Sequence, residues 1–233
     1  MEKKSQISNL QSQINLKVCG LTKLNQIQEL IYLNVDFLGF IFYEKSPRFV
    51  LNYLSLEEIK LIQHQGKVGV FVNETVDKIL EISENAGLNL LQLHGDEDEN
   101  FVFKLMQRLS KDVKIIKVFR IGETFSFQLS IFNPNVDYFL FDTDSQSFGG
   151  TGQTFDWNIL NNLEIPKPYF LSGGISLENI DELLNFVKVN LHENKTLTKL
   201  NPQKPLTLDI NSKFEIEAGV KDLEKIRLLM DKI

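Results

Sequence analysis

The chain has 233 residues, with 25 lysines and arginines against 31 aspartates and glutamates, a formal net charge of −6 and an isoelectric point near 5.2. An acidic chain lacks the basic surface that usually attracts a phosphate backbone, so we expect no nucleic-acid partner. The 42% hydrophobic share is typical of a soluble globular protein with a sizeable core, and this length fits one domain better than two.

The chain contains one cysteine, Cys19, so an intrachain disulfide is excluded and a reducing compartment is the simpler setting. No apolar stretch reaches the length of a membrane span, and residues 1–15 are polar and lack the apolar centre of a secretory signal. We therefore expect a cytoplasmic protein without a membrane partner. Residues 1–15 would form a flexible extension or a short extra helix, and residues 16–233 one barrel domain.

Eight short runs rich in β-branched and aromatic residues predict eight strands. In chain order they cover residues 16–19, 37–42, 67–72, 90–93, 114–119, 138–142, 169–171 and 206–210. Between them lie stretches with apolar residues at helical spacing, such as Leu24, Ile27, Leu30 and Ile31. Apolar strands that alternate with helices predict an α/β fold with a parallel sheet. Eight such units favour a closed (β/α)8 TIM barrel, with an open doubly wound sheet as the alternative.

Helix starts and one irregular segment complete the pattern. Ser55 begins a capping box, Asn73 or Thr75 caps the next helix, and Ser176 precedes the seventh. Residues 187–205 are polar and end with two prolines. This segment predicts a long, mobile surface connection after the seventh helix, without a catalytic role.

The residues that follow the strands mark the expected site, because parallel barrels build their active sites at the carboxyl ends of the strands. Cys19 holds this position at the first strand and Asp142 at the sixth. A thiol near cations or backbone amides has a lowered pKa and serves as a base or nucleophile, and a carboxyl can serve as an acid. Taken alone, Cys19 also fits a buried apolar filler, and Asp142 also fits a loop or helix-cap aspartate.

Other residues at this end fit an anionic ligand. Arg48 follows a Ser-Pro pair, so a stiff loop would present its guanidinium to a planar carboxylate, although a surface ion pair fits as well. Gly173 and Gly174 open a helix after the seventh strand, and Asn211 and Ser212 follow the eighth. Backbone amides and a helix N-terminus at these two places commonly bind phosphate in barrels.

Two familiar kinds of site are excluded. Residues 149–154 lack the lysine of a Walker loop, and Phe155 takes the place of the third glycine of a dinucleotide fingerprint. His64, His94 and His192 lack metal-ligand spacing, so we expect no metal. His94 fits a hydrogen-bonded residue at the rim better than a base.

Several groups of residues occur in a characteristic order. They are Lys17-Val18-Cys19-Gly20-Leu21-Thr22, Gly39-Phe40-Ile41-Phe42 with Ser46-Pro47-Arg48, Val68-Gly69-Val70-Phe71-Val72, Leu91-Gln92-Leu93-His94-Gly95, Phe141-Asp142-Thr143, Gly149-Gly150-Thr151-Gly152 with Thr154-Phe155-Asp156-Trp157, and Ser172-Gly173-Gly174. In this order they resemble the phosphoribosylanthranilate isomerase family. The resemblance runs from about residue 16 to the C-terminus and leaves out the N-terminal extension and the polar insert.

The resemblance implies an intramolecular oxidoreductase of tryptophan biosynthesis that needs no cofactor. By an Amadori rearrangement it converts N-(5'-phosphoribosyl)anthranilate to 1-(2-carboxyphenylamino)-1-deoxyribulose 5-phosphate. The partner would be this small molecule, and the protein a monomer or homodimer. The implied roles are Asp142 as acid, Cys19 as base, Arg48 at the anthranilate carboxylate, and Gly173, Gly174, Asn211 and Ser212 at the phosphate. Asp209 receives no assigned role.

One departure from the family pattern falls beside the expected phosphate site. The chain reads Ser212-Lys213-Phe214-Glu215 where the family has Ser-Gly-Val-Glu. Lys213 either supplies charge to the phosphate or points to solvent, and a positive φ there would strain the backbone. Two other functions stay open: a non-catalytic barrel that binds a phosphorylated ligand, and a related ribosyl-phosphate isomerase, which would use paired aspartates instead of a cysteine.

Overall fold

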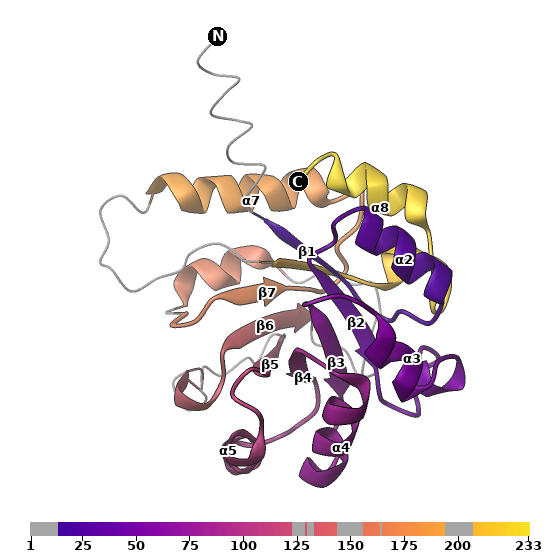
Figure 1. Ribbon diagram of the computed structural model, residues 1–233. Helices are drawn as coiled ribbons and strands as arrows, with labels where there is room; N and C mark the ends of the chain where they lie inside the picture. The colour runs from indigo at the N-terminus through magenta and orange to yellow at the C-terminus, as the bar shows by residue number, and fades with distance from the viewer. Residues whose placement is uncertain (1–13, 123–128, 130–132, 144–155, 164, 194–206) are drawn as a thin grey trace.

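The computed structural model describes residues 14–122, 129, 133–143, 156–163, 165–193 and 207–233. Within these residues, eight parallel strands close into a barrel in the order of the sequence (Figure 1). They are β1 (Asn15–Val18), β2 (Phe37–Ile41), β3 (Lys67–Phe71), β4 (Leu90–Leu93), β5 (Lys114–Ile121), β6 (Tyr138–Thr143), β7 (Tyr169–Leu171) and β8 (Thr207–Ile210). Val18 pairs with Leu38 of β2 on one side and with Ile210 of β8 on the other, which closes the ring. The predicted (β/α)8 barrel is therefore confirmed.

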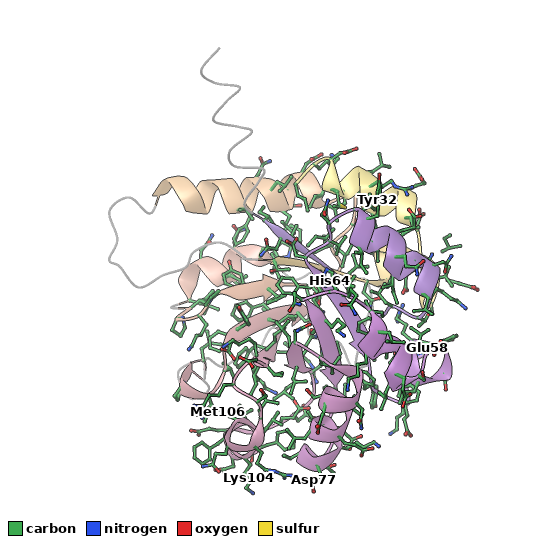
Figure 2. All side chains as sticks on the ribbon, in the orientation of Figure 1. Tyr32, Glu58, His64, Asp77, Lys104 and Met106 are labelled. Atoms are coloured by element: carbon green, nitrogen blue, oxygen red, sulfur yellow. The ribbon has the colours of Figure 1, made fainter. Side chains whose placement is uncertain are left out.

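Helices surround the barrel (Figure 1). They are α2 (Leu24–Tyr32), α3 (Leu56–Leu61), α4 (Val76–Ala86), α5 (Glu99–Arg108), α7 (Ile180–Glu193) and α8 (Leu223–Met230), with short 3-10 helices at η1 (Val50–Asn52), η2 (Asn133–Asn135), η3 (Trp157–Asn162) and η4 (Ser212–Phe214). Ser55 and Glu58 form the expected capping box, and the Thr75 side chain caps α4. Tyr32 of α2 and Met106 of α5 lie at the periphery (Figure 2). None of the described helices is long and apolar enough to cross a membrane.

Three boundaries differ from the prediction. Asn15, which we placed in the N-terminal extension, already belongs to β1. The helix expected after Ser176 begins at Ile180, after a turn in which the Asn179 N–H donates to the Ser176 carbonyl at 3.4 Å and Asn179 Oδ1 accepts from the Ser176 N–H at 2.9 Å. The same helix continues to Glu193, into the segment we interpreted as a surface connection, since no glycine or proline interrupts it. Residues 1–13 and 194–206 lie outside the described residues.

A small antiparallel hairpin, which the sequence did not predict, follows β8. It consists of β9 (Glu215–Glu217) and β10 (Val220–Lys221), strands too short to stand out in a sequence pattern. Thr22 Oγ1 donates to the Gly219 carbonyl at 2.6 Å, and Gln26 Nε2 donates to the Lys221 carbonyl at 2.7 Å. These bonds fix the hairpin beside β1 and α2.

The interior of the barrel has an apolar layer. It contains Val68, Leu90, Ile116, Val118, Leu140 and Phe170, with Phe37 and Tyr138 packed against it. Because alternate residues of a strand face the same side, Gln92 and Asp142 face inward two residues beyond Leu90 and Leu140. The apolar layer thus supports a polar layer nearer the carboxyl ends of the strands.

Candidate active site

All of the expected site residues lie at the carboxyl ends of strands: Cys19 after β1, Arg48 in the connection after β2, Asp142 near the end of β6, Gly173 and Gly174 after β7, and Asn211 and Ser212 after β8. Because the eight strands are parallel, these positions share one end of the barrel. Residues 144–155, which include the glycine-rich segment 149–152, lie outside the described residues.

A buried ion pair forms the centre of the polar layer. Lys17 Nζ donates to Asp209 Oδ2 at 2.8 Å and to Gln92 Oε1 at 2.9 Å, and all three side chains are buried. Burial alone would lower the pKa of Lys17, but Asp209 and Cys19 raise it above its ordinary value, which keeps the ammonium charged. Burial raises the pKa of the Asp209 carboxyl, and Lys17 opposes that rise.

Cys19 lies beside this ion pair. A side-chain carbon at position 39 would come within 2.8 Å of Cys19 Sγ, so Gly39 of β2 makes room for the thiol. Burial raises the pKa of the thiol; the Lys17 ammonium acts against this, Asp209 adds to the rise, and Lys221 again opposes it, leaving the pKa above its ordinary value. Our expectation of a lowered pKa is therefore wrong, because the cations are present but the thiol is closed to water.

Both carboxyl oxygens of Asp142 have a polar partner. Oδ1 accepts from the Thr143 N–H at 2.8 Å, and Oδ2 lies 3.3 Å from His94 Nε2. The prediction that His94 is a hydrogen-bonded rim residue is confirmed. A Cβ at position 173 would come within 2.2 Å of Thr143 Oγ1 and 3.2 Å of Asp142 Oδ1, and φ there is +88°, so only glycine fits. Gly173 thus leaves room for the carboxyl group.

Arg48 is part of a second, largely buried charge cluster. Its Nε and Nη2 donate to both carboxylate oxygens of Glu215, at 2.9, 3.0 and 2.5 Å. Glu215 Oε1 also accepts from Lys221 Nζ at 2.6 Å and from the Gly219 N–H at 3.0 Å. The ion pair we considered for Arg48 therefore exists, but only 12% of the Arg48 side chain is exposed, so it is no surface pair. Within the described part of the chain, Nη1 makes no hydrogen bond and is available to a ligand.

The residues expected at a phosphate lie on two neighbouring strand ends, β7 and β8. The backbone N–H groups of Gly173 and Gly174 donate no hydrogen bond to any described residue. We expected these two glycines to open a helix directly, but α7 begins six positions beyond Gly174. Asn211 Oδ1 accepts from Lys221 Nζ at 2.8 Å, and Ser212 begins the 3-10 helix η4.

Sequence reasoning missed the residues that organise these two clusters. None of Lys17, Gln92, Glu215 and Lys221 was predicted as a site residue. A signal was present for two of them, because Lys17 and Gln92 are polar residues inside short apolar strands. Among the described residues, no group of three or more histidine, cysteine, aspartate or glutamate side chains is arranged to hold a metal ion.

Comparison with known proteins gives a consistent result. The family described as N-(5'phosphoribosyl)anthranilate (PRA) isomerase matches residues 16–232. The N-(5'-phosphoribosyl)anthranilate isomerase of Parabacteroides distasonis is 35% identical over 221 residues, which cover 94% of this chain and 92% of that protein. Among solved structures, the phosphoribosyl anthranilate isomerase of Thermus thermophilus superposes with a TM-score of 0.74 at 24% identity, over 94% and 98% of the two chains. An isomerase in complex with reduced 1-(o-carboxyphenylamino)-1-deoxyribulose 5-phosphate superposes with a TM-score of 0.68 at 25% identity, over 94% and 97%.

Proposed function

This chain belongs to the phosphoribosylanthranilate isomerase family, and we propose that Cys19 and Asp142 carry out the two proton transfers of its reaction. The reaction converts N-(5'-phosphoribosyl)anthranilate to 1-(2-carboxyphenylamino)-1-deoxyribulose 5-phosphate, a step of tryptophan biosynthesis. It opens a furanose ring and moves a hydrogen from C2' to C1'. It therefore requires an acid at the ring oxygen and a base at C2'.

Asp142 acts as the acid in this proposal. Its protonated carboxyl gives a proton to the ring oxygen, the C1'–O bond breaks, and the nitrogen lone pair forms the C1'=N bond of an iminium. The hydrogen bond from the Thr143 N–H and the contact with the His94 ring position the two oxygens before the substrate arrives, so that little reorganisation is needed in the transition state.

Cys19 acts as the base. The adjacent iminium makes the C2' hydrogen acidic; the thiolate takes this proton, and the C2'–H electron pair forms the C1'=C2' bond of an enolamine. Tautomerisation of that enolamine gives the ketone product. A thiol of raised pKa is a stronger base when ionised, although a smaller fraction is ionised at neutral pH. The Lys17 ammonium limits this loss because it stabilises the thiolate.

The anionic ends of the substrate would be bound by the remaining residues. The free Nη1 edge of Arg48 is suited to the anthranilate carboxylate, with Glu215 holding the other edge of the guanidinium. The backbone N–H groups of Gly173 and Gly174 would bind the phosphate, with Asn211 and Ser212 on the neighbouring strand end. Backbone donors at this place of a barrel are suited to a phosphate.

One observation carries the assignment of acid and base. Cys19 follows the strand of Lys17, and the polar contacts of Lys17 run through Gln92 at 2.9 Å and on from Gln92 to His94 at 2.8 Å, with His94 3.3 Å from Asp142 Oδ2 on another strand. The two groups therefore flank the same polar centre, as an acid and a base that act on neighbouring atoms of one sugar must do.

The loss of phosphoribosylanthranilate fluorescence on addition of the protein tests the proposal. Wild-type protein should turn the substrate over. Both Cys19→Ala and Asp142→Asn should lower kcat by about 10²-fold to 10⁴-fold, the usual contribution of a general acid or base.

Asp77→Asn is a matched control for Asp142→Asn, because it makes the same chemical change at an exposed residue of α4 on the periphery (Figure 2). It should leave kcat and KM unchanged. Full turnover in either Cys19→Ala or Asp142→Asn would show that the role assigned to that residue is wrong.

A further inference from the structure

A continuous chain of close polar contacts crosses the polar layer from β8 to β6. It begins at Asp209 Oδ2, passes through Lys17 Nζ at 2.8 Å and reaches Gln92 Oε1 at 2.9 Å. Gln92 Nε2 then lies 2.8 Å from His94 Nδ1, and His94 Nε2 lies 3.3 Å from Asp142 Oδ2. The chain therefore connects a buried ammonium to the proposed acid through one amide and one imidazole.

The ammonium decides which way the Gln92 amide faces. A lysine ammonium has three donors and no acceptor, so only the amide oxygen can face Lys17. The amide NH₂ group then faces His94, where it is a donor. The reverse orientation would place the NH₂ of Gln92 against the ammonium and the oxygen against the ring, leaving two donors in contact inside a buried layer.

The amide in turn decides where the His94 ring carries its proton. Since Gln92 donates to Nδ1, that nitrogen must be an unprotonated acceptor. An imidazolium would set an N–H against the amide N–H, so the hydrogen-bonded ring is neutral and protonated at Nε2. Its single N–H is therefore on the nitrogen that lies 3.3 Å from Asp142 Oδ2.

We propose that Gln92 is a positioning residue, which locks His94 as the neutral Nε2–H tautomer and so holds the carboxyl of Asp142 by a neutral donor. This inference rests on the proposed role of Asp142 as acid. A positive ring at this place would favour the carboxylate, which has no proton to give, whereas the other neutral tautomer would accept the acid's proton instead of leaving it for the substrate.

The charged groups around the ring come from several strands. Asp142 of β6 faces Nε2, Asp209 of β8 interacts electrostatically with the ring, and Lys17 of β1 lies beyond the amide. Arg120 of β5 donates to the His94 carbonyl at 2.8 Å. Of these groups, only the Gln92 amide contacts Nδ1, so the tautomer argument depends on that donor.

Nuclear magnetic resonance reads the tautomer directly, without an activity assay. The chain has three histidines, so a ¹⁵N-labelled sample gives a long-range ¹H–¹⁵N spectrum with only three ring patterns, and loss of one pattern in His94→Gln assigns it. Above the ordinary histidine pKa, wild-type His94 should show protonated Nε2 and unprotonated Nδ1. A protonated Nδ1 in wild-type protein would overturn the inference.

Gln92→Glu tests the cause. A carboxylate at this position accepts, so it should draw a proton to His94 Nδ1 and change the ring pattern. It keeps a partner for Lys17, which favours folding. His64 is an internal control, because it too accepts at Nδ1 and has a partner at Nε2, but from the backbone of Gly66 and Val35 at the opposite end of the barrel. Its pattern should not change.

Kinetics then separate positioning from structure. Gln92→Glu should lower kcat about tenfold and leave KM within about threefold, because the tautomer acts on proton transfer and not on binding. An unchanged His94 pattern or an unchanged kcat in folded Gln92→Glu would overturn the inference. A different pair of results would separate the two proposals. If Asp142→Asn stays active while wild-type His94 shows the expected tautomer, the role of Asp142 is refuted and the tautomer lock stands.

Discussion

Replacement of Lys17 by methionine should raise the pKa of the Cys19 thiol further. Lys17 is the strongest of the groups that oppose the effect of burial on this thiol, and methionine fills a similar volume without the charge. Removing an opposite charge at such short range typically moves a pKa by about 1 to 3 units. The neighbouring Asp209 sets where in this range the change should fall.

Asp209 reduces the expected shift because it loses its partner in the same variant. A buried carboxylate without a cation takes up a proton, and its negative charge, which also raises the pKa of Cys19, then disappears. We therefore expect a rise smaller than the loss of the Lys17 charge alone would cause, which lowers the thiolate fraction at neutral pH. The Asp209→Asn replacement alone should change the pKa of the thiol in the opposite direction and lower it.

The assay is the ultraviolet absorbance of the thiolate as a function of pH. Cys19 is the only cysteine, so the Cys19→Ser protein supplies the blank for tyrosine ionisation. Circular dichroism at each pH checks that Lys17→Met stays folded. A wild-type value below the ordinary cysteine pKa, or a fall in Lys17→Met, would refute the reasoning that burial dominates and that Lys17 opposes it.

Two further predictions concern the binding end of the site. Glu215→Gln should raise KM about tenfold with little change in kcat, because Arg48 loses the carboxylate that orients it. Burial would raise the pKa of Glu215, but Arg48 and Lys221 lower it below its ordinary value. The stability that the Glu215 carboxylate contributes is therefore present above its ordinary pKa in the unfolded chain, about pH 4.3. It is lost as the pH falls through the lower pKa that Glu215 has in the folded protein. Urea unfolding of Glu215→Gln should show a shallower fall in stability in that window, and an unchanged slope would contradict the ion pair. Lys213 is exposed and its φ is not positive, so Lys213→Gly should leave KM within about twofold; a larger rise would indicate a phosphate contact.

The strands could be predicted because each one is a local signal. Residues 90–93 and 169–171 were predicted to the residue, β1 differs by one position at each end, and β2, β3, β5 and β6 differ by one or two positions at one end. Residue 206, which we expected to begin the eighth strand, lies outside the described residues. The position of Cys19 and Asp142 at one rim follows from parallel strands without knowledge of any contact. Helix ends were less predictable: α7 begins at Ile180 after a turn, and it continues to Glu193 through a polar segment that we expected to be a connection.

The partners of the site residues could not be predicted in the same way. Lys17 and Asp209 are 192 positions apart, and Arg48 and Glu215 are 167 apart, so no local pattern relates them. The pKa of Cys19 was misjudged for a related reason. Its direction depends on the balance between burial, the nearby Lys17 and the charges of Asp209 and Lys221 from distant parts of the sequence, and that balance exists only after the barrel has closed.

The polar layer and the apolar layer of the barrel interior have different roles. Replacing a buried ion pair by apolar residues is often neutral or stabilising, so Lys17 and Asp209 are poor candidates for holding the strands together. The apolar layer two residues earlier can do that, with Leu140 buried on the same strand as Asp142. Leu140→Ala should therefore lower the free energy of unfolding by about 2 to 5 kcal/mol, whereas Asp142→Asn should lower kcat and change the free energy of unfolding little. A barrel built this way can change its proton chemistry in one layer without losing the packing of the other.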